Sequence, residues 1–536
     1  MTIADVLATE ISHVLGELGA PLNANEIHLE RPARLEHGDL STNVALALAK
    51  RVGTSPREFA SRIGSALEAR TIEHVDAIEI AGPGFVNFRL RSSWLHAVLV
   101  QVVTEGIDNY ARLDLGSGER VQVEFVSANP TGPLHVGNGW LGSYGDALSR
   151  VLRRCGWQVS TEYYVNDTGN QIRMLGESVL ARRSGSEIPE QGYQGAYVAD
   201  LGFAYNGPDE VIAAGRYAAE EILKSIRMTL DRLGIVFDEW YSQASIEESG
   251  KVAETVALMR ERNLVYEEGD AVWLRSTDLG DPRDRVLIKA NGDATYLAGD
   301  LAYHRDKFLV RGFDRVIDVF GADHHGQVAS LEAGVEALGI DRTRLEVKLG
   351  QLVSLVSGRM SKRSGNYVRL DELIDEIGPD ATRLMSLMSS IDQASTLDLD
   401  AVTARSMENP VFYVQYAYAR ISSIGRVVHE RGIVRSSLDT ADLSLLAHTR
   451  ELDLLRTLYT LPSVLREAAV ERAPYKVTNF ARALAGEFHG FYHDCRVLGD
   501  GVSAPETQAR LWLVEATRIG LSIALGLLGV SAPEKM

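Results

Sequence analysis

The residues best suited to chemistry lie where an alternating strand pattern gives way to a helical one. Residues 121–126 alternate apolar and polar side chains, and helical spacing starts after His135-Val136-Gly137-Asn138. A helix N-terminus offers unpaired backbone N–H groups and a partial positive charge, which suit phosphate. Gly137 allows close approach, and His135 and Asn138 can both donate hydrogen bonds from one side of the first turn. The segment is either a nucleotide-binding turn or a plain loop with a capping asparagine.

A second segment concentrates positive charge. Residues 358–366 read GRMSKRSGN, with Arg359, Lys362 and Arg363 among small residues. The segment is either a solvated basic turn or a loop that closes on a triphosphate and stabilises charge in the transition state. Taken together with the first turn, it favours a triphosphate loop.

Composition limits the class of protein. The 536 residues carry a formal net charge of −18 and two distant cysteines, Cys155 and Cys495. This charge argues against coating nucleic acid through a global basic field, but RNA can still bind to local patches. Two cysteines are too few for a disulfide framework and suit a reducing compartment. No export signal and no stretch of roughly 18 consecutive apolar residues is evident, so we expect a cytoplasmic protein without membrane contact.

Three regions differ in pattern. Residues 1–112 mix helical spacing with alternating runs around a Gly-Pro-Gly turn, which predicts a small α+β domain. Residues 113–396 contain strand, helix and strand with short joints, which predicts a parallel α/β sheet, with a mostly helical insertion around 170–262. Residues 397–536 show amphipathic helices, which predict an all-α bundle.

Two acidic residues could select a cationic substrate. Glu124 lies on the strand before the first turn, and Asp300 ends the segment Tyr-Leu-Ala-Gly-Asp. A guanidinium requires a carboxylate, ideally in a bidentate pair shielded from water. Each has a plain alternative: an outward strand position for Glu124 and a helix cap for Asp300.

A histidine pair follows the strand pattern at 315–320, which we interpret as the final strand of the parallel sheet. The pair, His324 and His325, stands next to Asp323. Neighbouring histidines usually point apart, and no third ligand stands at a recognisable spacing, so no protein-bound zinc is expected. Because ligands bind at the carboxyl ends of parallel strands, contact with adenosine or an amino acid is the better interpretation.

These motifs resemble those of a known family. His135 to Asn138 after a strand, with Met360-Ser361-Lys362 in a basic loop, resemble the HIGH and KMSKS signatures of class I aminoacyl-tRNA synthetases. Asn138 replaces the second histidine, and arginines flank the lysine loop. Further stretches are similar to the arginyl-tRNA synthetase family in its own order: residues 81–88, 127–138, 409–417 and 527–536.

The resemblance implies a fold and a reaction. The sheet domain would be a Rossmann-like catalytic domain, residues 1–112 a tRNA-contacting domain and residues 397–536 an anticodon-binding domain. The enzyme would be an arginine–tRNA ligase that forms arginyl-adenylate from L-arginine and ATP with Mg²⁺, releases pyrophosphate, and transfers arginine to the 3′ end of its tRNA. The resemblance also implies that tRNA binds before arginine is activated. We expect a monomer.

The resemblance also assigns roles to individual residues. Catalysis is expected of His135, Asn138 and Lys362. ATP contacts are expected of Pro133, His135, Gly137, Asn138, Arg359, Met360, Ser361 and Lys362. Arginine contacts are expected of Glu124, Ser127, Asn129, Asn138, Tyr296, Asp300 and His324. tRNA contacts are expected of Phe85, Asn87, Tyr413, Tyr416 and Arg420, although the two tyrosines of the bundle would equally suit helix packing.

Other functions fit part of the pattern. A class I synthetase for lysine or cysteine shares both signatures, although the absence of a cysteine-based zinc site weighs against cysteine. A small-molecule nucleotidylyltransferase shares the first turn but has no use for about 130 residues of helical bundle. A non-catalytic tRNA-binding relative would be expected to have lost His135 or Lys362, and both are present.

Replacing Lys362 with alanine is expected to lower turnover strongly, because the triphosphate loses a cation that stabilises developing charge. Affinity for tRNA should stay nearly unchanged. Steady-state aminoacylation and a tRNA-binding titration measure the two quantities. A large loss of tRNA binding would instead show that the loop is mainly an RNA contact.

Overall fold

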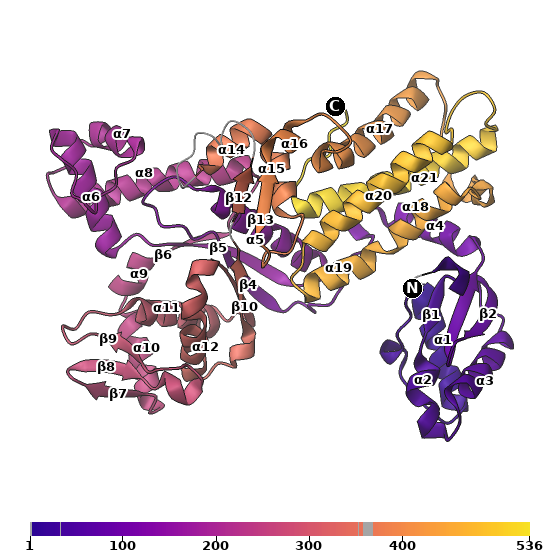
Figure 1. The fold of residues 1–536 in the computed structure, drawn as a ribbon, viewed down its shortest axis with the longest axis horizontal. Coiled ribbons are helices and arrows are strands. Elements are labelled where there is room, and N and C mark those ends of the chain that lie inside the picture. Colours follow the sequence, from indigo (N-terminus) through magenta and orange to yellow (C-terminus); the bar gives the residue numbers. More distant parts are fainter. Residues whose placement is uncertain (1–2, 33, 352, 357–367) are drawn as a thin grey trace. The chain divides into compact units, whose positions relative to one another are not determined.

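The computed structural model describes residues 3–32, 34–351, 353–356 and 368–536 (Figure 1). They form two compact units, each assembled from separate stretches of chain. The first comprises Met1–Gly106, Val428–Tyr459 and Glu487–Ile519, and the second Ile107–Val427, Thr460–Gly486 and Gly520–Met536. The domain limits at residues 112 and 396 stay sequence predictions.

The first unit contains the predicted N-terminal α+β fold (Figure 1, indigo). Its antiparallel sheet has the order β1–β3–β2, and Leu40 lies opposite Phe88 in the register of β1 and β3. Helix α4 is interrupted at Gly106, where φ is +63°, and the division between the units falls at this residue. The elements are α1 (Ile3–Glu17), β1 (Leu40–Thr42), α2 (Val44–Leu48), α3 (Pro56–Glu68), β2 (Val75–Ala81), β3 (Phe85–Leu90), α4 (Ser93–Asn109) and α18 (Thr449–Tyr459).

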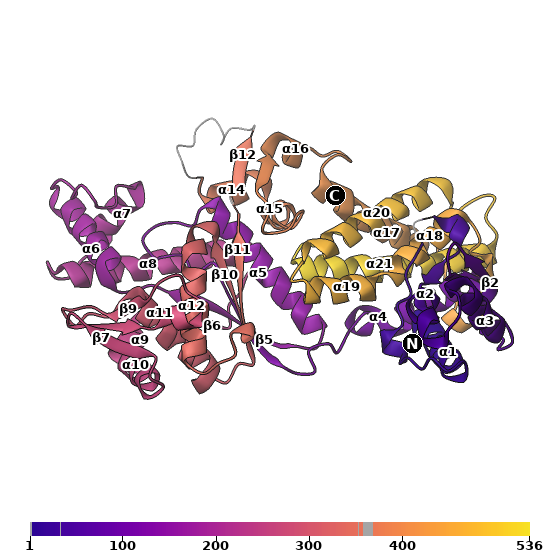
Figure 2. The same cartoon turned by 60° about the horizontal axis from the view of Figure 1, so that its bottom comes forward.

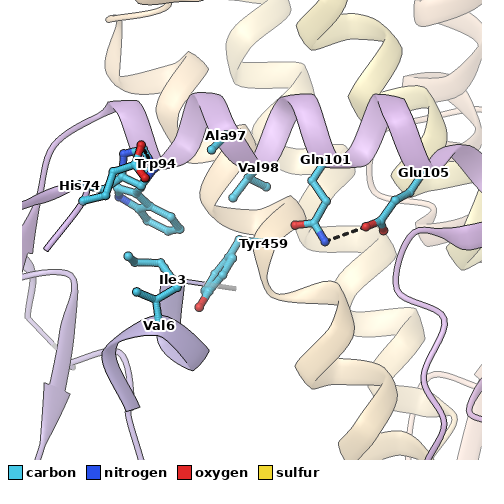
Figure 3. Close-up of a pocket in the computed structure, with 10 residues that line it drawn as sticks. Ile3, Val6, His74, Trp94, Ala97, Val98, Gln101, Glu105 and Tyr459 are labelled. Atoms are coloured by element: carbon cyan, nitrogen blue, oxygen red, sulfur yellow. Dashed lines mark hydrogen bonds and ion pairs between the residues drawn. The ribbon is translucent and has the colours of Figure 1, made fainter. Parts of the chain in front are cut away.

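A cavity of about 390 Å³ lies within this unit, lined by side chains from α1, α4 and α18 (Figure 3). Trp94 and Tyr459 meet edge to face there, with ring centroids 4.9 Å apart. Gln101 donates a hydrogen bond of 2.9 Å to Glu105 along α4. The aromatic contact therefore joins helices of this unit that are far apart in sequence.

The second unit is built on a five-stranded sheet with the order β11–β10–β4–β5–β6. All four pairings are parallel, so the predicted Rossmann-like α/β sheet is confirmed. Strands β5 and β10 flank the first strand, β4, which makes the end of β4 a topological switch point. The strands are β4 (Arg120–Phe125), β5 (Gln158–Val165), β6 (Glu239–Ser242), β10 (Arg315–Gly321) and β11 (Leu345–Gly350).

Two strands correct the sequence analysis. Strand β10 is not the last strand of the sheet, because β11 follows it and pairs parallel to it. The charged residues Glu346 and Lys348 weaken the apolar signal of β11. Strand β6 lies inside the region predicted as mostly helical, and at four residues it is too short for a clear period.

Helix α5 (Val136–Arg154) packs on β4, β5 and β10, and Figure 2 shows α5 and α12 (Val328–Ala337) on opposite sides of β10. Its approach to β4 is close: a Cβ atom at Gly145 would lie 2.2 Å from the Phe125 ring. Glycine at this position lets the helix lie directly on the sheet.

The remaining elements of the sheet domain surround this core. Strands β7, β8 and β9 form a separate antiparallel sheet, and α11 continues into a π-helical turn, Asp306–Val310. The bounds are α6 (Gly169–Ser184), α7 (Ala196–Ala204), α8 (Val211–Arg232), α9 (Gln243–Glu248), α10 (Lys251–Glu261), β7 (Val265–Glu268), β8 (Ala271–Leu274), β9 (Arg285–Ile288), α11 (Tyr296–Arg305) and α12 (Val328–Ala337).

The C-terminal region is mainly helical, as predicted, after a short parallel strand pair. Helix α21 is long and apolar enough to cross a membrane by composition, but its most apolar window is 72% buried within the protein, as expected of a core helix. The bounds are β12 (Val353–Val356), α14 (Leu370–Ile377), α15 (Pro379–Ser386), β13 (Ser395–Asp398), α16 (Leu399–Thr403), α17 (Pro410–Glu430), α19 (Leu461–Val470), α20 (Tyr475–Asp494) and α21 (Ala504–Leu528).

Gly145→Ala is expected to lower the free energy of unfolding by about 1–3 kcal/mol, because the added methyl group overpacks the contact with Phe125. Gly425→Ala on α17 is the matched control. A Cβ there meets nothing within 4 Å, and alanine should stabilise the helix by about 0.5–1 kcal/mol. Thermal unfolding compares the two variants, and equal effects of the same sign would contradict the packing.

Candidate active site

A cavity of about 580 Å³ opens where β4, β5 and β10 end, and α11 forms one wall. It lies at the switch point of the sheet, where parallel α/β folds bind ligands. Asn138 does not line it. The other predicted arginine contacts do: Glu124, Ser127, Asn129, Tyr296, Asp300 and His324.

The chain turns sharply as it leaves β4. Val126 and Ser127 have φ values of +68° and +37°, a region that branched residues such as valine rarely adopt. The turn places the Ser127 hydroxyl beside Glu124, and it donates a hydrogen bond of 3.0 Å to Oε1. The backbone N–H of Tyr164 donates to the same hydroxyl at 3.1 Å. Neighbouring strands therefore hold the strained turn in place.

Glu124 is buried and already paired. Its side chain accepts a hydrogen bond of 2.7 Å from Nζ of Lys307, which is wholly buried and also donates to Asp318 at 2.9 Å. Burial raises the pKa of Glu124, and the ammonium of Lys307 opposes this shift. Sequence analysis missed Lys307. The available signal was the spacing of four and three that places Asp300, His304 and Lys307 on one helix face.

Asp300 presents a different kind of carboxylate. It lines the cavity, and the described part of the chain gives its carboxylate no ion pair or hydrogen bond. Burial raises its pKa to about 6, assisted by the negative charges of Glu124 and Asp318 and opposed by His304 and Lys307. A shielded carboxylate without a partner suits a cationic ligand that can donate several hydrogen bonds.

The turn at His135–Asn138, predicted to bind a nucleotide and called the nucleotide turn below, is held by a hydrogen bond within its own helix cap. The backbone N–H of His135 donates to Oδ1 of Asn138 at 3.0 Å, so Asn138 sets the start of α5. Loss of hydration lowers the pKa of His135, and Asp323 opposes this shift. This shift favours the neutral imidazole, which can donate one hydrogen bond to a phosphate oxygen. Pro133 lies in the loop just before this turn.

The chain that follows the basic segment runs along the nucleotide turn. Val136 N–H donates to the carbonyl of Val368 at 3.1 Å, and Leu370 N–H donates to the carbonyl of Leu134 at 2.8 Å. A β-bridge pairs His135 with Arg369 between them. Residue 368 is thus anchored beside the N-terminus of α5. The predicted contacts of the basic segment lie outside the described residues: Arg359, Met360, Ser361 and Lys362.

The predicted tRNA contacts of the first unit differ in exposure. Phe85 is half-buried at the start of β3. Asn87 is buried, and its amide oxygen accepts a hydrogen bond of 2.6 Å from the Ser41 hydroxyl. That bond ties β3 to β1, which gives Asn87 a structural role within the sheet.

The predicted tRNA contacts on α17 point in two different directions. Phe412 stacks on Tyr416 with ring centroids 5.2 Å apart, and the guanidinium of Arg420 lies 4.3 Å from the Tyr416 centroid. This stack follows one line of the helix. The Tyr413 hydroxyl lies instead against Gly486 of α20. Tyr416 and Arg420 therefore form one half-buried aromatic–cationic platform, and Tyr413 lies apart from it.

The Asp323-His324-His325 segment does not form a metal site with other described residues. Within the described ranges no three His, Cys, Asp or Glu side chains converge as a metal site requires. His324 lies near the ring of Phe320, with centroids 5.4 Å apart, and its Nδ1 is 3.3 Å from Gln327 Oε1. His324 thus faces its own helix turn and the cavity.

Comparison with known families agrees with this geometry. Residues 207–405 match the model "tRNA synthetases class I (R), catalytic domain". Residues 5–90 match the arginyl tRNA synthetase N terminal domain, and residues 414–536 match the DALR anticodon binding domain. Fold and site together define a class I aminoacyl-tRNA synthetase.

Relatives that span all or nearly all of the chain narrow the class to one family. An arginine–tRNA ligase of Carboxydothermus hydrogenoformans is 45% identical and covers 95% of this chain and 94% of its own. That of Frankia alni is 44% identical and covers 100% of this chain and 99% of its own. The arginyl-tRNA synthetase of Thermus thermophilus shares the fold, with a TM-score of 0.77 at 21% identity over 100% of both chains. The chain belongs to the arginine–tRNA ligase family.

The raised pKa of Asp300 predicts how arginine use depends on pH. Below about pH 6 the carboxyl group takes up a proton, so the KM for arginine should rise, approaching tenfold per pH unit. Asp300→Asn should raise the KM at least tenfold at pH 7.5 and abolish this dependence. Asp278→Asn, at an exposed position away from the cavity, is the control. The same KM in both variants would remove Asp300 from the substrate site.

Proposed function

We propose that the chain joins L-arginine to its tRNA in two steps, at the cavity where β4 and β10 end. The observation that carries this is the carboxylate of Asp300, which has no partner among the described residues and shares a cavity with Glu124 at the switch point that also holds the nucleotide turn. A guanidinium fits that carboxylate because it is permanently charged and donates in a planar fork. A lysine ammonium matches the charge but not the fork.

In the first step an arginine carboxylate oxygen attacks the α-phosphorus of ATP. The bond between that phosphorus and the bridging oxygen breaks, and pyrophosphate leaves with the electron pair. In the second step a terminal ribose hydroxyl of tRNA attacks the arginyl carbonyl carbon, AMP departs, and the hydroxyl proton is released. No protein nucleophile is needed, so positioning and charge stabilisation carry the rate. Mg²⁺ enters with ATP as part of the substrate.

The assignments to individual residues belong to this proposal. His135 and the first N–H groups of α5 hold phosphate oxygens, and Asn138 fixes the turn that presents them. Lys362, with Arg359 beside it, neutralises the leaving pyrophosphate. These contacts follow from the class I signatures, and the anchoring of Val368 beside His135 supports them. The remaining ATP contacts proposed are Pro133, Gly137, Met360 and Ser361.

The amino-acid side of the site is proposed in the same way. Asp300 receives the guanidinium, and Glu124 shapes the floor beside it. The other contacts proposed are Ser127, Asn129, Asn138, Tyr296 and His324. The match of residues 414–536 to an anticodon-binding domain supports a tRNA partner, for which Tyr416 and Arg420 offer a stacking platform. Phe85, Asn87 and Tyr413 complete the proposed tRNA contacts. We infer a cytoplasmic monomer.

ATP–pyrophosphate exchange tests the proposed function. Each standard amino acid is supplied with and without tRNA, and label incorporation into ATP is followed. Among the amino acids, only arginine should support exchange, and it should do so only when tRNA is present. Exchange with lysine in place of arginine would overturn the proposed substrate.

A further inference from the structure

Four carboxylates stand in one row across the face of the sheet beneath the cavity. Asp318 of β10 lies opposite Glu124 of β4, which lies opposite Glu162 of β5, which in turn lies opposite Glu239 of β6. The first three are at most 4% exposed. Neighbouring strands lie only about 4.8 Å apart, so adjacent buried carboxylates repel one another unless cations separate them.

Two cations pair with these carboxylates: Lys307 lies within the π-helical turn that continues α11, and Arg311 directly follows that turn. Nζ of Lys307 lies 2.7 Å from Glu124 and 2.9 Å from Asp318. Arg311 donates hydrogen bonds to the Glu162 carboxylate from both of its terminal nitrogens, and its Nη1 lies 3.2 Å from Oε2 of Glu239. The π-helical turn Asp306–Val310 widens the helix between these two residues, as such turns often do near functional sites.

Lys307 cannot touch a substrate directly. It has no exposed surface, and its ammonium is enclosed by the two carboxylates and the ring of Tyr303, whose centroid is 4.2 Å away. It can act only through Glu124. Lys307 holds Oε2 of that carboxylate and Ser127 holds Oε1, so the plane of the group is fixed. Each oxygen still keeps a lone pair that can accept one more hydrogen bond.

Asp318 extends the same arrangement to Asp300. Its Oδ2 lies 2.8 Å from Nε2 of His304, and Nδ1 of that ring lies 2.7 Å from the backbone carbonyl of Asp300. A carbonyl oxygen only accepts hydrogen bonds, so Nδ1 carries a proton and donates. The lysine, the histidine and Asp318 thus connect Glu124 on the sheet to the helix turn that carries Asp300.

We propose that Lys307 is a positioning residue of the amino-acid pocket. It orients Glu124 and offsets one of the two negative charges of Glu124 and Asp318. Asp300 is left as the carboxylate that draws the guanidinium in, with Glu124 held as a fixed hydrogen-bond acceptor. This inference rests on the proposed function, because it assigns arginine to this cavity.

A double-mutant cycle between Lys307→Met and Glu124→Gln tests the proposal, with the KM for arginine, the KM for ATP and kcat measured for each variant. Lys307→Met should raise the KM for arginine at least tenfold and change the KM for ATP less than about twofold. The double variant should be no worse for arginine than Glu124→Gln alone, since Lys307 acts only through Glu124.

Lys251→Met is the matched control. Lys251 forms an ion pair of 2.8 Å with Asp306 in the same charged region but does not line the cavity. It should lower the melting temperature and leave the KM for arginine unchanged. An unchanged KM in Lys307→Met, or additive losses in the double variant, would overturn the proposal.

The proposal can still be tested if the Lys307→Met variant does not fold. If Lys307→Met alone does not fold, the double variant, which removes one charge of each sign, is compared with Glu124→Gln. Equal KM values support the proposal, and a further tenfold rise in the double variant overturns it. Wild-type exchange with arginine tests the proposed function separately, so a failure confined to the variants concerns Lys307 alone.

Discussion

The ion pair on which the pocket depends is buried between strands: Lys307 lies between Glu124 and Asp318. Burial alone would lower the pKa of Lys307, but the two carboxylates raise it above its ordinary value, so the lysine stays charged. Removing one partner of such a group typically costs about 3–5 kcal/mol, because the other charge is left uncompensated. The interaction therefore holds α11 against the sheet and fixes the pocket floor with the same contacts.

Strand β4 connects the two halves of the site. Glu124 lies near its end on the face toward α11, while Phe125 faces α5 on the other side. The strained turn at Val126 and Ser127 then leads directly to the nucleotide turn at His135. Because one short segment carries both proposed sites, the proposal holds the amino acid and the nucleotide close together, which is the main requirement of a reaction that needs no protein nucleophile.

Local sequence patterns made part of the fold and of the candidate site predictable. The strand, loop and helix around His135 follow from periodicity and from glycine and proline placement. Similarity to the family predicted that Glu124 and Asp300 contact arginine. Lys307 gave only the helical spacing that it shares with Asp300 and His304, because its partners lie on β4 and β10, which are neighbours only in the folded sheet. Its sequence context, His-Arg-Asp-Lys, looks like an exposed helix end. Strands β6 and β11 were missed because shortness or charged residues hid their period.

A structure of the protein with a non-hydrolysable arginyl-adenylate analogue tests the central claim most directly. The account predicts the guanidinium within hydrogen-bond distance of both Asp300 carboxylate oxygens, the adenosine phosphate at the N-terminus of α5, and Lys307 still bound to Glu124. A guanidinium paired with Glu124 after displacing Lys307, or bound away from Asp300, would contradict it.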